Sequence, residues 1–473
     1  SENIGIGYQA LFDNTLGVRN IGIGIFSLGS NTFGDNNIGI GFQSLGTNTT
    51  GNQNLGIGAF SLYGNNIGTN NIGLGFESLR NNFSGIDNVA IGSQALLNNS
   101  SGSNNIAIGV LSLNSSTLAS NNIAIGKLAA SGAGSNPLGD NNIAIGYEAL
   151  YQNGSANNIG IGHNTQRANG TGNHNVSLGN EALYSNISGF NNMAIGFGAL
   201  YSSNFDSNNT AIGHNAMNLS LGGSDNVAIG YEAMFNTSSV SNSVAVGNQA
   251  MRNINGGQYS TAIGYQAMNF GTGQFNTALG GQAMFEGGGQ HNTAIGYSTL
   301  YSHSTGEDNI GLGTFTLFDN DGGGSNVAVG REALRSNVFG NNNVSIGSYS
   351  LHSTLGSTNI AIGYEAGYLN GNGNNNIFLG YRSGNSGGGN GNVVIGYESR
   401  NFISGANNKL IIGSSVSANP NPLIYGEFDN DILRTNGELQ IGDPTDTGYA
   451  LPTTDGTANQ ILQTDGSGSI SWV

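Results

Sequence analysis

The chain has 473 residues, of which 81 are glycine and only 8% are charged, and 11 basic residues leave a formal net charge of −16. A typical soluble domain is about a quarter charged, so the composition argues against an ordinary enzyme domain. Five prolines without a Gly-X-Y period exclude collagen. The absence of a basic patch argues against nucleic-acid binding, and no apolar run is long enough to span a membrane. Without cysteine, disulfides and thiolate metal sites are excluded.

One short unit recurs along the chain. It opens with Asn-Ile-Gly-Ile-Gly or Asn-Ile-Ala-Ile-Gly and returns 25 times between residues 3 and 416, in steps of 16 or 17 residues. One longer step carries an insertion around Asn136 and Pro137. A step this regular indicates one supersecondary unit stacked many times. We therefore predict a repeat array over residues 1–416 and a separate β-rich segment over residues 417–473, where the repeat stops.

Each position of the unit has a physical interpretation. Positions two and four are apolar, as in Ile4 and Ile6, which is typical of a strand. Position five is glycine in all 25 units and is expected to need a positive φ, a β-bulge or a very close backbone approach. Position one is asparagine in 23 units, which favours stacked amide ladders. Positions eight and nine, a small residue followed by leucine or methionine, predict a second short strand.

Two short strands and two turns per unit predict an all-β fold, a parallel β-solenoid of about 25 coils of 16–17 residues with a spacing of about 4.8 Å. We expect positions two, four and nine to fill the coil interior. Position three would then face outward, yet it is small in the first 22 units. A small outward residue suggests sister chains packed close by, so we predict a homotrimer whose interface includes Ala194, Ala211, Ala228 and Ala245.

The repeat resembles a known family. The run Ser241-Asn242-Ser243-Val244-Ala245-Val246-Gly247 and the many Asn-Ile-Ala-Ile-Gly units are similar to the head repeats of YadA-like trimeric autotransporter adhesins and to repeats of phage tail fibres. The resemblance implies a left-handed β-roll, a homotrimer, and an extracellular place on a virion tail fibre or a cell surface. Residues 450–466 resemble a segment of tail-fibre-type proteins and favour that branch.

Motifs for catalysis or cofactor binding are weak. The Gly-x-Gly strings lie in solenoid turns and not before helices, so they predict no nucleotide site. Residues 319–322 look like the start of a calcium loop, but the twelfth position is Gly330 and not glutamate, which favours a solvated turn. Glutamates recur at position seven, one per unit, and we interpret them as a solvated stripe: Glu148, Glu232, Glu332 and Glu365. We predict no enzyme activity, no cofactor and no metal site.

Position six is often aromatic. One interpretation is packing between neighbouring coils at the rim. The other is a partly exposed row that contacts a glycan or protein receptor, and its candidate members are Tyr147, Phe197, Tyr231, Tyr265 and Tyr297.

These observations predict a non-enzymatic trimeric fibre that projects from a virion or cell surface and mediates attachment. The main alternative is a purely structural extracellular filament or spacer whose binding tip lies elsewhere. An ice-binding solenoid would need threonine at every turn, and a polysaccharide depolymerase would need a cleft with paired carboxylates; the sequence has neither pattern.

Overall fold

The computed structural model is an all-β parallel β-solenoid, as the sequence predicts. It describes residues 2–132, 138–399, 405–414, 422–435, 440–441, 449–452, 456–465 and 470–473, and no helix occurs in these ranges. The residues around the insertion, 133–137, lie outside them. The chain divides into two compact units, Ser1–Gln266 and Ala267–Val473, which are described one at a time.

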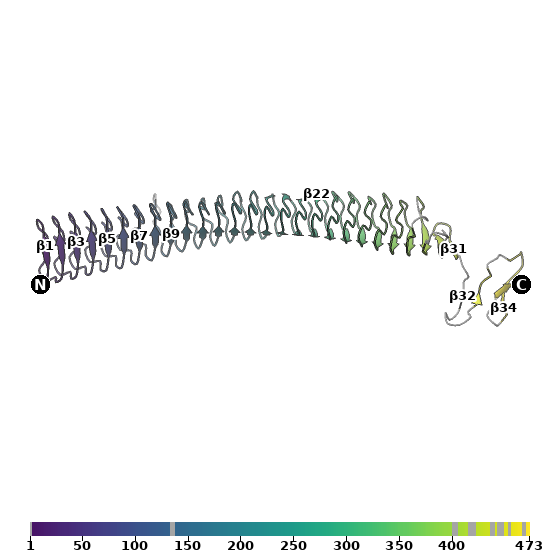
Figure 1. Ribbon diagram of the computed structural model, residues 1–473, viewed down its shortest axis with the longest axis horizontal. Helices are drawn as coiled ribbons and strands as arrows, with labels where there is room; N and C mark the ends of the chain where they lie inside the picture. The colour runs from purple at the N-terminus through teal and green to yellow at the C-terminus, as the bar shows by residue number, and fades with distance from the viewer. Residues whose placement is uncertain are drawn as a thin grey trace. The chain divides into compact units, whose positions relative to one another are not determined.

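Unit 1 is a ladder of sixteen three-residue strands, one per coil, paired in parallel so that each position of the unit lies beside the same position of the next coil. Figure 1 shows these strands side by side. They are β1 (Ile4–Ile6), β2 (Ile21–Ile23), β3 (Ile38–Ile40), β4 (Leu55–Ile57), β5 (Ile72–Leu74), β6 (Val89–Ile91), β7 (Ile106–Ile108), β8 (Ile123–Ile125), β9 (Ile143–Ile145), β10 (Ile159–Ile161), β11 (Val176–Leu178), β12 (Met193–Ile195), β13 (Thr210–Ile212), β14 (Val227–Ile229), β15 (Val244–Val246) and β17 (Thr261–Ile263). The two-residue β16 (Asn253–Ile254) lies between the last two.

Unit 2 continues the same pattern with nine parallel strands: β19 (Thr277–Leu279), β21 (Thr293–Ile295), β23 (Ile310–Leu312), β24 (Val327–Val329), β25 (Val344–Ile346), β26 (Ile360–Ile362), β27 (Ile377–Leu379), β28 (Val393–Ile395) and β29 (Lys409–Ile412). A second, shorter ladder joins β18 (Phe270–Gly271), β20 (Glu286–Gly287) and β22 (Ser302–His303).

The pairing becomes antiparallel towards the end of the chain. Strand β29 pairs with β30 (Ile424–Glu427), which pairs with β31 (Ile432–Thr435). Two small antiparallel pairs follow, β32 (Gln440–Ile441) with β33 (Tyr449–Ala450) and β34 (Leu462–Thr464) with β35 (Ile470–Trp472). The predicted boundary at residues 416 and 417 stays a prediction.

The coil interior differs from the prediction. The side chain at position three, and not those at positions two and four, points inward. At Gly39, for example, an added Cβ would lie 2.7 Å from the Ser27 hydroxyl oxygen and 3.3 Å from Cγ of Leu28. Positions three, eight and nine therefore share one thin core, and the leucine or methionine at position nine is fully buried in almost every coil. The thin core explains why position three is small.

The predicted trimer-interface residues are consequently wrong. Each of them has an exposed fraction of 0% within the single chain, because its methyl group fills the coil interior and no surface is left for a partner: Ala194, Ala211, Ala228 and Ala245. The residues that do face outward from the strands are the aliphatic ones at positions two and four.

The second predicted strand, at positions eight and nine, is also wrong. Positions six to eleven fold as successive tight turns, and the residues at positions seven and nine take left-handed φ values, such as 53° at Leu45. Backbone hydrogen bonds still join the coils there: the Leu28 N–H donates to the Ser44 carbonyl at 3.0 Å. Turns replace the strand because the chain must reverse direction within a coil of 16–17 residues.

The glycine at position five combines two of the three alternatives that the sequence leaves open, a positive φ and a close backbone approach. Its φ lies between 122° and 140° in 24 of the 25 sequence repeats. At Gly196, an added Cβ would lie 2.4 Å from the Gly213 carbonyl oxygen in the next coil. A side chain there would be strained and would also collide with the neighbouring backbone.

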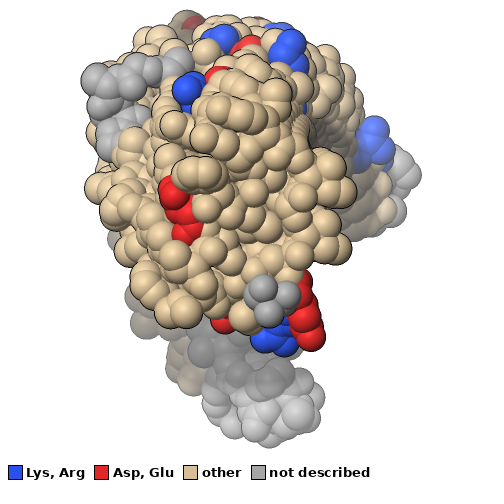
Figure 2. All heavy atoms as spheres, turned by 90° about the vertical axis from the view of Figure 1, so that its left-hand side faces the viewer, with Lys and Arg blue, Asp and Glu red and all other residues tan. Residues whose placement is uncertain are grey.

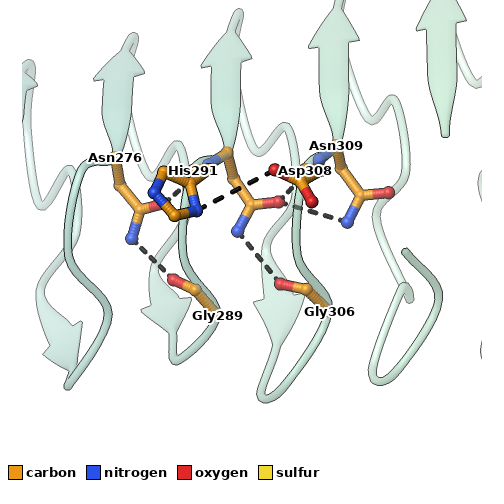
Figure 3. A network of polar contacts seen from close by, with 7 residues as sticks. Asn276, Gly289, His291, Gly306, Asp308 and Asn309 are labelled. Carbon is orange, nitrogen blue, oxygen red and sulfur yellow. Dashed lines mark hydrogen bonds and ion pairs between the residues drawn. The ribbon is translucent and has the colours of Figure 1, made fainter. Parts of the chain in front are cut away.

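The asparagine at position one forms the predicted amide ladder, which Figure 3 shows in unit 2. The Asn292 backbone N–H donates to Oδ1 of Asn276 at 2.8 Å, and Nδ2 of Asn292 donates to the Gly306 carbonyl at 3.0 Å. Each side chain thereby closes its own coil and bonds the adjacent one. These groups are buried, so each bond avoids the cost of an unpaired polar atom.

Unit 2 contains an exchange that confirms the shared interior. Position three becomes Phe378, whose ring is 1% exposed. Position nine becomes glycine in the same coil, at Gly384, and in the preceding coil, at Gly367. A Cβ at Gly384 would lie 2.2 Å from a carbon of the Phe378 ring. The ring thus takes the space that leucine fills in other coils.

Candidate functional site

The outer face of the strand ladder is the first candidate site. In each of the two compact units, the aliphatic side chains at positions two and four of successive repeats form two parallel rows that are only half-buried. Ile91 and Ile125 in unit 1 are each 37% exposed, and Ile310 and Leu312 in unit 2 are 47% and 45% exposed. Figure 2, which views the molecule from the end with β1, shows that uncharged residues cover most of the visible surface. A repeated apolar row of this kind marks an interaction surface.

The five predicted surface aromatics at position six lie on the surface of the coils, each between 42% and 54% exposed. The structure also gives several of them the rim packing of the other interpretation. Tyr147 stacks on His163 with ring centroids 5.3 Å apart, and Phe197 stacks on His214 at 5.2 Å. His214 in turn stacks on Tyr231. Tyr265 belongs to unit 1 and Tyr297 to unit 2, so the structure does not bring the five together as one site.

A second row, at position ten, was not singled out in the sequence. In unit 1, Tyr184 and Tyr201 stack with ring centroids 4.9 Å apart, and the Arg167 guanidinium lies 5.2 Å from the ring of Tyr151. In unit 2, Tyr301 stacks on Phe318 at 5.0 Å. The recurrence of tyrosine, phenylalanine and arginine directly after position nine is the sequence signal that could have revealed this row.

The glutamates at position seven are not the solvated stripe that the sequence suggested. Their side chains are 11–18% exposed, and each carboxylate pairs with an arginine. Arg252 Nε, for example, lies 2.5 Å from Oε2 of Glu232. Burial raises the pKa of Glu232, but hydrogen bonds from Arg252, Gln249 and Tyr231 outweigh burial and hold the pKa below its usual value. The Glu232 carboxylate therefore stays ionised and is poorly suited to act as a general acid.

A pocket opens on the side of the first four coils of unit 1. Its volume is about 270 Å³. Its lining combines three aromatic rings with uncharged polar groups and one carboxylate: Gln9, Phe12, Asp13, Phe26, Gly29, Ser30, Gln43, Gly46, Thr47 and Tyr63. These residues occupy positions seven, ten and eleven of consecutive units.

One buried carboxylate stands apart from these surfaces. Asp206 is 4% exposed and occupies position fifteen, where most units have glycine. One oxygen accepts a hydrogen bond from the Gly223 N–H at 3.0 Å, and the other has no partner. Burial raises the pKa of Asp206 to about 6. Among the described residues no basic group forms an ion pair with Asp206, so its buried carboxylate destabilises the fold and has no partner for acid–base catalysis.

The remaining chemistry is sparse. Across the described residues, no three His, Asp or Glu side chains are grouped so that they could hold a metal ion, and none of these residues belongs to a helix able to cross a bilayer. Comparisons with family models, with curated proteins and with solved structures found no match.

Proposed function

We propose that the chain is a non-enzymatic fibre module that assembles as a homotrimer through the outer apolar face of its strand ladder and presents an attachment surface outside a cell or virion. The observation that carries the proposal is the double row of half-exposed aliphatic side chains at positions two and four. The proposal includes no nucleic-acid partner, no membrane insertion and no catalysis.

The energetics support burial of this face against other copies. Full burial of an aliphatic side chain is worth roughly 1.5–3 kcal/mol. A side chain that is about 37% exposed, such as Ile91, therefore gains roughly 0.6–1 kcal/mol on complete burial. Ten of the outward-facing apolar side chains on the sixteen strands of unit 1 are at least 36% exposed, and these alone gain roughly 6–10 kcal/mol per chain, which is comparable with the roughly 4–15 kcal/mol that association costs.

Threefold assembly is supported by the geometry of the face and by the resemblance to trimeric adhesin and tail-fibre repeats. Each face is only three residues wide and carries two aliphatic rows. Around a threefold axis, one row can contact each of the two neighbouring chains. Glu148 and Glu232 are each paired with an arginine, so neither carboxylate is free to act as a general acid, which favours binding over hydrolysis as the role of the exposed sides.

Attachment is tested by displaying the purified full chain on beads and measuring retention of bacterial and eukaryotic cells, with beads carrying an unrelated β-solenoid as the control. We expect specific retention of at least one cell type. Retention equal to the control for every cell type would contradict attachment and leave the spacer role, while the oligomeric state is measured separately by light scattering.

A further inference from the structure

The pocket in the first four coils exists because the position-ten row is interrupted. Phe12 and Tyr63 occupy position ten in the first and fourth coils, and the two coils between them carry Gly29 and Gly46. Glycine occurs at position ten in no other unit. Where aromatic residues occupy position ten in neighbouring coils, as at Tyr184 and Tyr201, the rings stack on one another. Here the two missing side chains leave a cavity of about 270 Å³ with an aromatic ring at either end.

The ring of Tyr63 leans over the floor of the pocket. A Cβ at Gly46 would lie 3.0 Å from two carbons of that ring. Tyr63 is held in place by an edge-to-face contact with Phe60, with ring centroids 5.9 Å apart. On the opposite rim, Phe26 makes a similar contact with Tyr8 at 5.6 Å. The aromatic walls are therefore braced by neighbours outside the pocket, and their inner surfaces remain available.

Three polar side chains of the lining make no hydrogen bond to the described part of the chain. Among the described residues, no hydrogen bond joins the side-chain amide of Gln9 or Gln43, or the Ser30 hydroxyl, to another group. The Thr47 hydroxyl donates to the Tyr63 carbonyl at 2.7 Å and keeps its acceptor capacity. Two amides and two hydroxyls thus face a volume that also has apolar walls, and Asp13 is the only charged residue of the lining.

We propose that this pocket binds an uncharged sugar residue of a glycan. The C–H faces of a pyranose ring suit aromatic walls, and its hydroxyls both donate and accept, which matches amides, hydroxyls and one carboxylate. The volume lies just below the range of about 300–1,000 Å³ that holds drug-sized ligands, so one or two sugar rings fit. A lining without lysine or arginine disfavours anionic sugars. The inference rests on the proposed attachment function for its biological role and names the ligand class.

Saturation-transfer NMR on the full chain tests the inference. The probes are the methyl glycosides of glucose, galactose, mannose and N-acetylglucosamine, with N-acetylneuraminate as the anionic comparison. Irradiation of the aromatic protons should transfer saturation to ring C–H protons of at least one neutral glycoside. No transfer to any of them would overturn the inference, and so would stronger transfer to N-acetylneuraminate than to every neutral probe.

Two variants locate the binding. Gly29→Tyr extends the aromatic row into the pocket, and the new Cβ would meet its nearest atom, the Phe26 carbonyl oxygen, at 3.3 Å. Tyrosine already occupies position ten in several coils, so the fold should tolerate it. The matched control is Leu97→Tyr, which introduces the same residue at position ten of a coil outside the pocket. We expect about tenfold or greater loss of affinity, about 1.4 kcal/mol, for Gly29→Tyr, and none for Leu97→Tyr.

A third variant covers the case in which Gly29→Tyr does not fold. Gln43→Leu removes one amide and preserves the cavity, and leucine is compatible with the left-handed φ at position seven, as Leu111 shows. It should weaken binding roughly two- to tenfold. Unchanged affinity in both pocket variants would overturn the inference. Cell retention without glycoside binding would refute the pocket and leave attachment intact, whereas glycoside binding without cell retention would do the reverse.

Discussion

Replacing three isoleucines on the outer strand face by lysine should separate the proposed trimer into folded monomers. Ile91, Ile106 and Ile125 lie on consecutive strands, and each is 36–37% exposed in the single chain. In a trimer, nine such side chains lose the roughly 0.6–1 kcal/mol that each gains on burial, a total of roughly 5–10 kcal/mol. Lysines enclosed there would add a desolvation penalty of several kcal/mol per charge. In the monomer the ammonium groups reach water while their stems cover the sheet.

The assay is light scattering during gel filtration, combined with circular dichroism. We expect the unaltered chain to have three times the chain mass, and Ile91→Lys/Ile106→Lys/Ile125→Lys to have the chain mass with the same β spectrum. The control, Ile67→Lys/Ser101→Lys/Leu118→Lys, adds the same charge at exposed residues outside the strands and should remain trimeric. A lysine variant that stays trimeric, or an unaltered chain that is monomeric at every concentration, would refute the reasoning.

Three further predictions concern the coil interior. Gly196→Val should destabilise the chain by roughly 2–4 kcal/mol, because φ is +129° and the new Cβ meets the Gly213 carbonyl oxygen at 2.4 Å; an unchanged thermal midpoint would contradict this. Ala194→Arg should lower the free energy of unfolding by about 3–5 kcal/mol because it buries an unpaired charge. An unchanged melting temperature would show that the side chain at position 194 faces the surface. The pKa of Asp206 is about 6 in the fold against 3.8 as its ordinary value. The unfolded chain therefore loses its proton first, and stability falls as pH rises from about 4 to 6. Asp206→Asn should remove this slope and stabilise the chain at pH 7 by roughly 1–3 kcal/mol; a slope that persists in denaturant titrations would exclude Asp206 as its source.

The period of the repeat, and the roles of the positions that carry the same residue type in successive repeats, could be predicted because each follows from local chemistry. A glycine at every fifth position indicates a backbone constraint, and the φ of +129° at Gly196 meets it. An asparagine at every first position indicates a ladder, and the bond from the Asn292 N–H to Asn276 supplies it. These features depend on one residue and its copy in the next coil.

The inside and the outside could not be assigned from alternation alone. In an ordinary half-buried strand the apolar residues face the core, so Ile4 and Ile6 were placed inside. The decisive signal was a compensating exchange: Phe378 at position three occurs where position nine is Gly367 and Gly384. Two positions that trade volume in this way share one space, and that exchange is visible in the sequence.

The pocket and the position-ten row were missed for a different reason. Each depends on residues about 17 positions apart in the sequence. Only the stacking of the coils shows that Phe12 and Tyr63 lie at the two ends of the same cavity. Once the register is known, two glycines between two aromatic residues at position ten predict a gap. Position six, by contrast, was noticed because its aromatic residues are frequent, although stacking such as that of Tyr147 on His163 covers part of each ring.

The thinness of the coil connects the fold to the proposed assembly. An interior filled by one leucine or methionine, one small residue from position eight and one from position three has no room for the aliphatic residues of the strand. A sequence that keeps isoleucine and valine at positions two and four in coil after coil therefore keeps them on the outside, where an unpaired sheet face would normally carry polar residues. Their β-branched shape supports the strand, but threonine would do that as well, as it does at position two of only four coils, at Thr210, Thr261, Thr277 and Thr293. The preference for aliphatic residues is explained if the face is buried against other copies, which is the condition that the lysine variant tests.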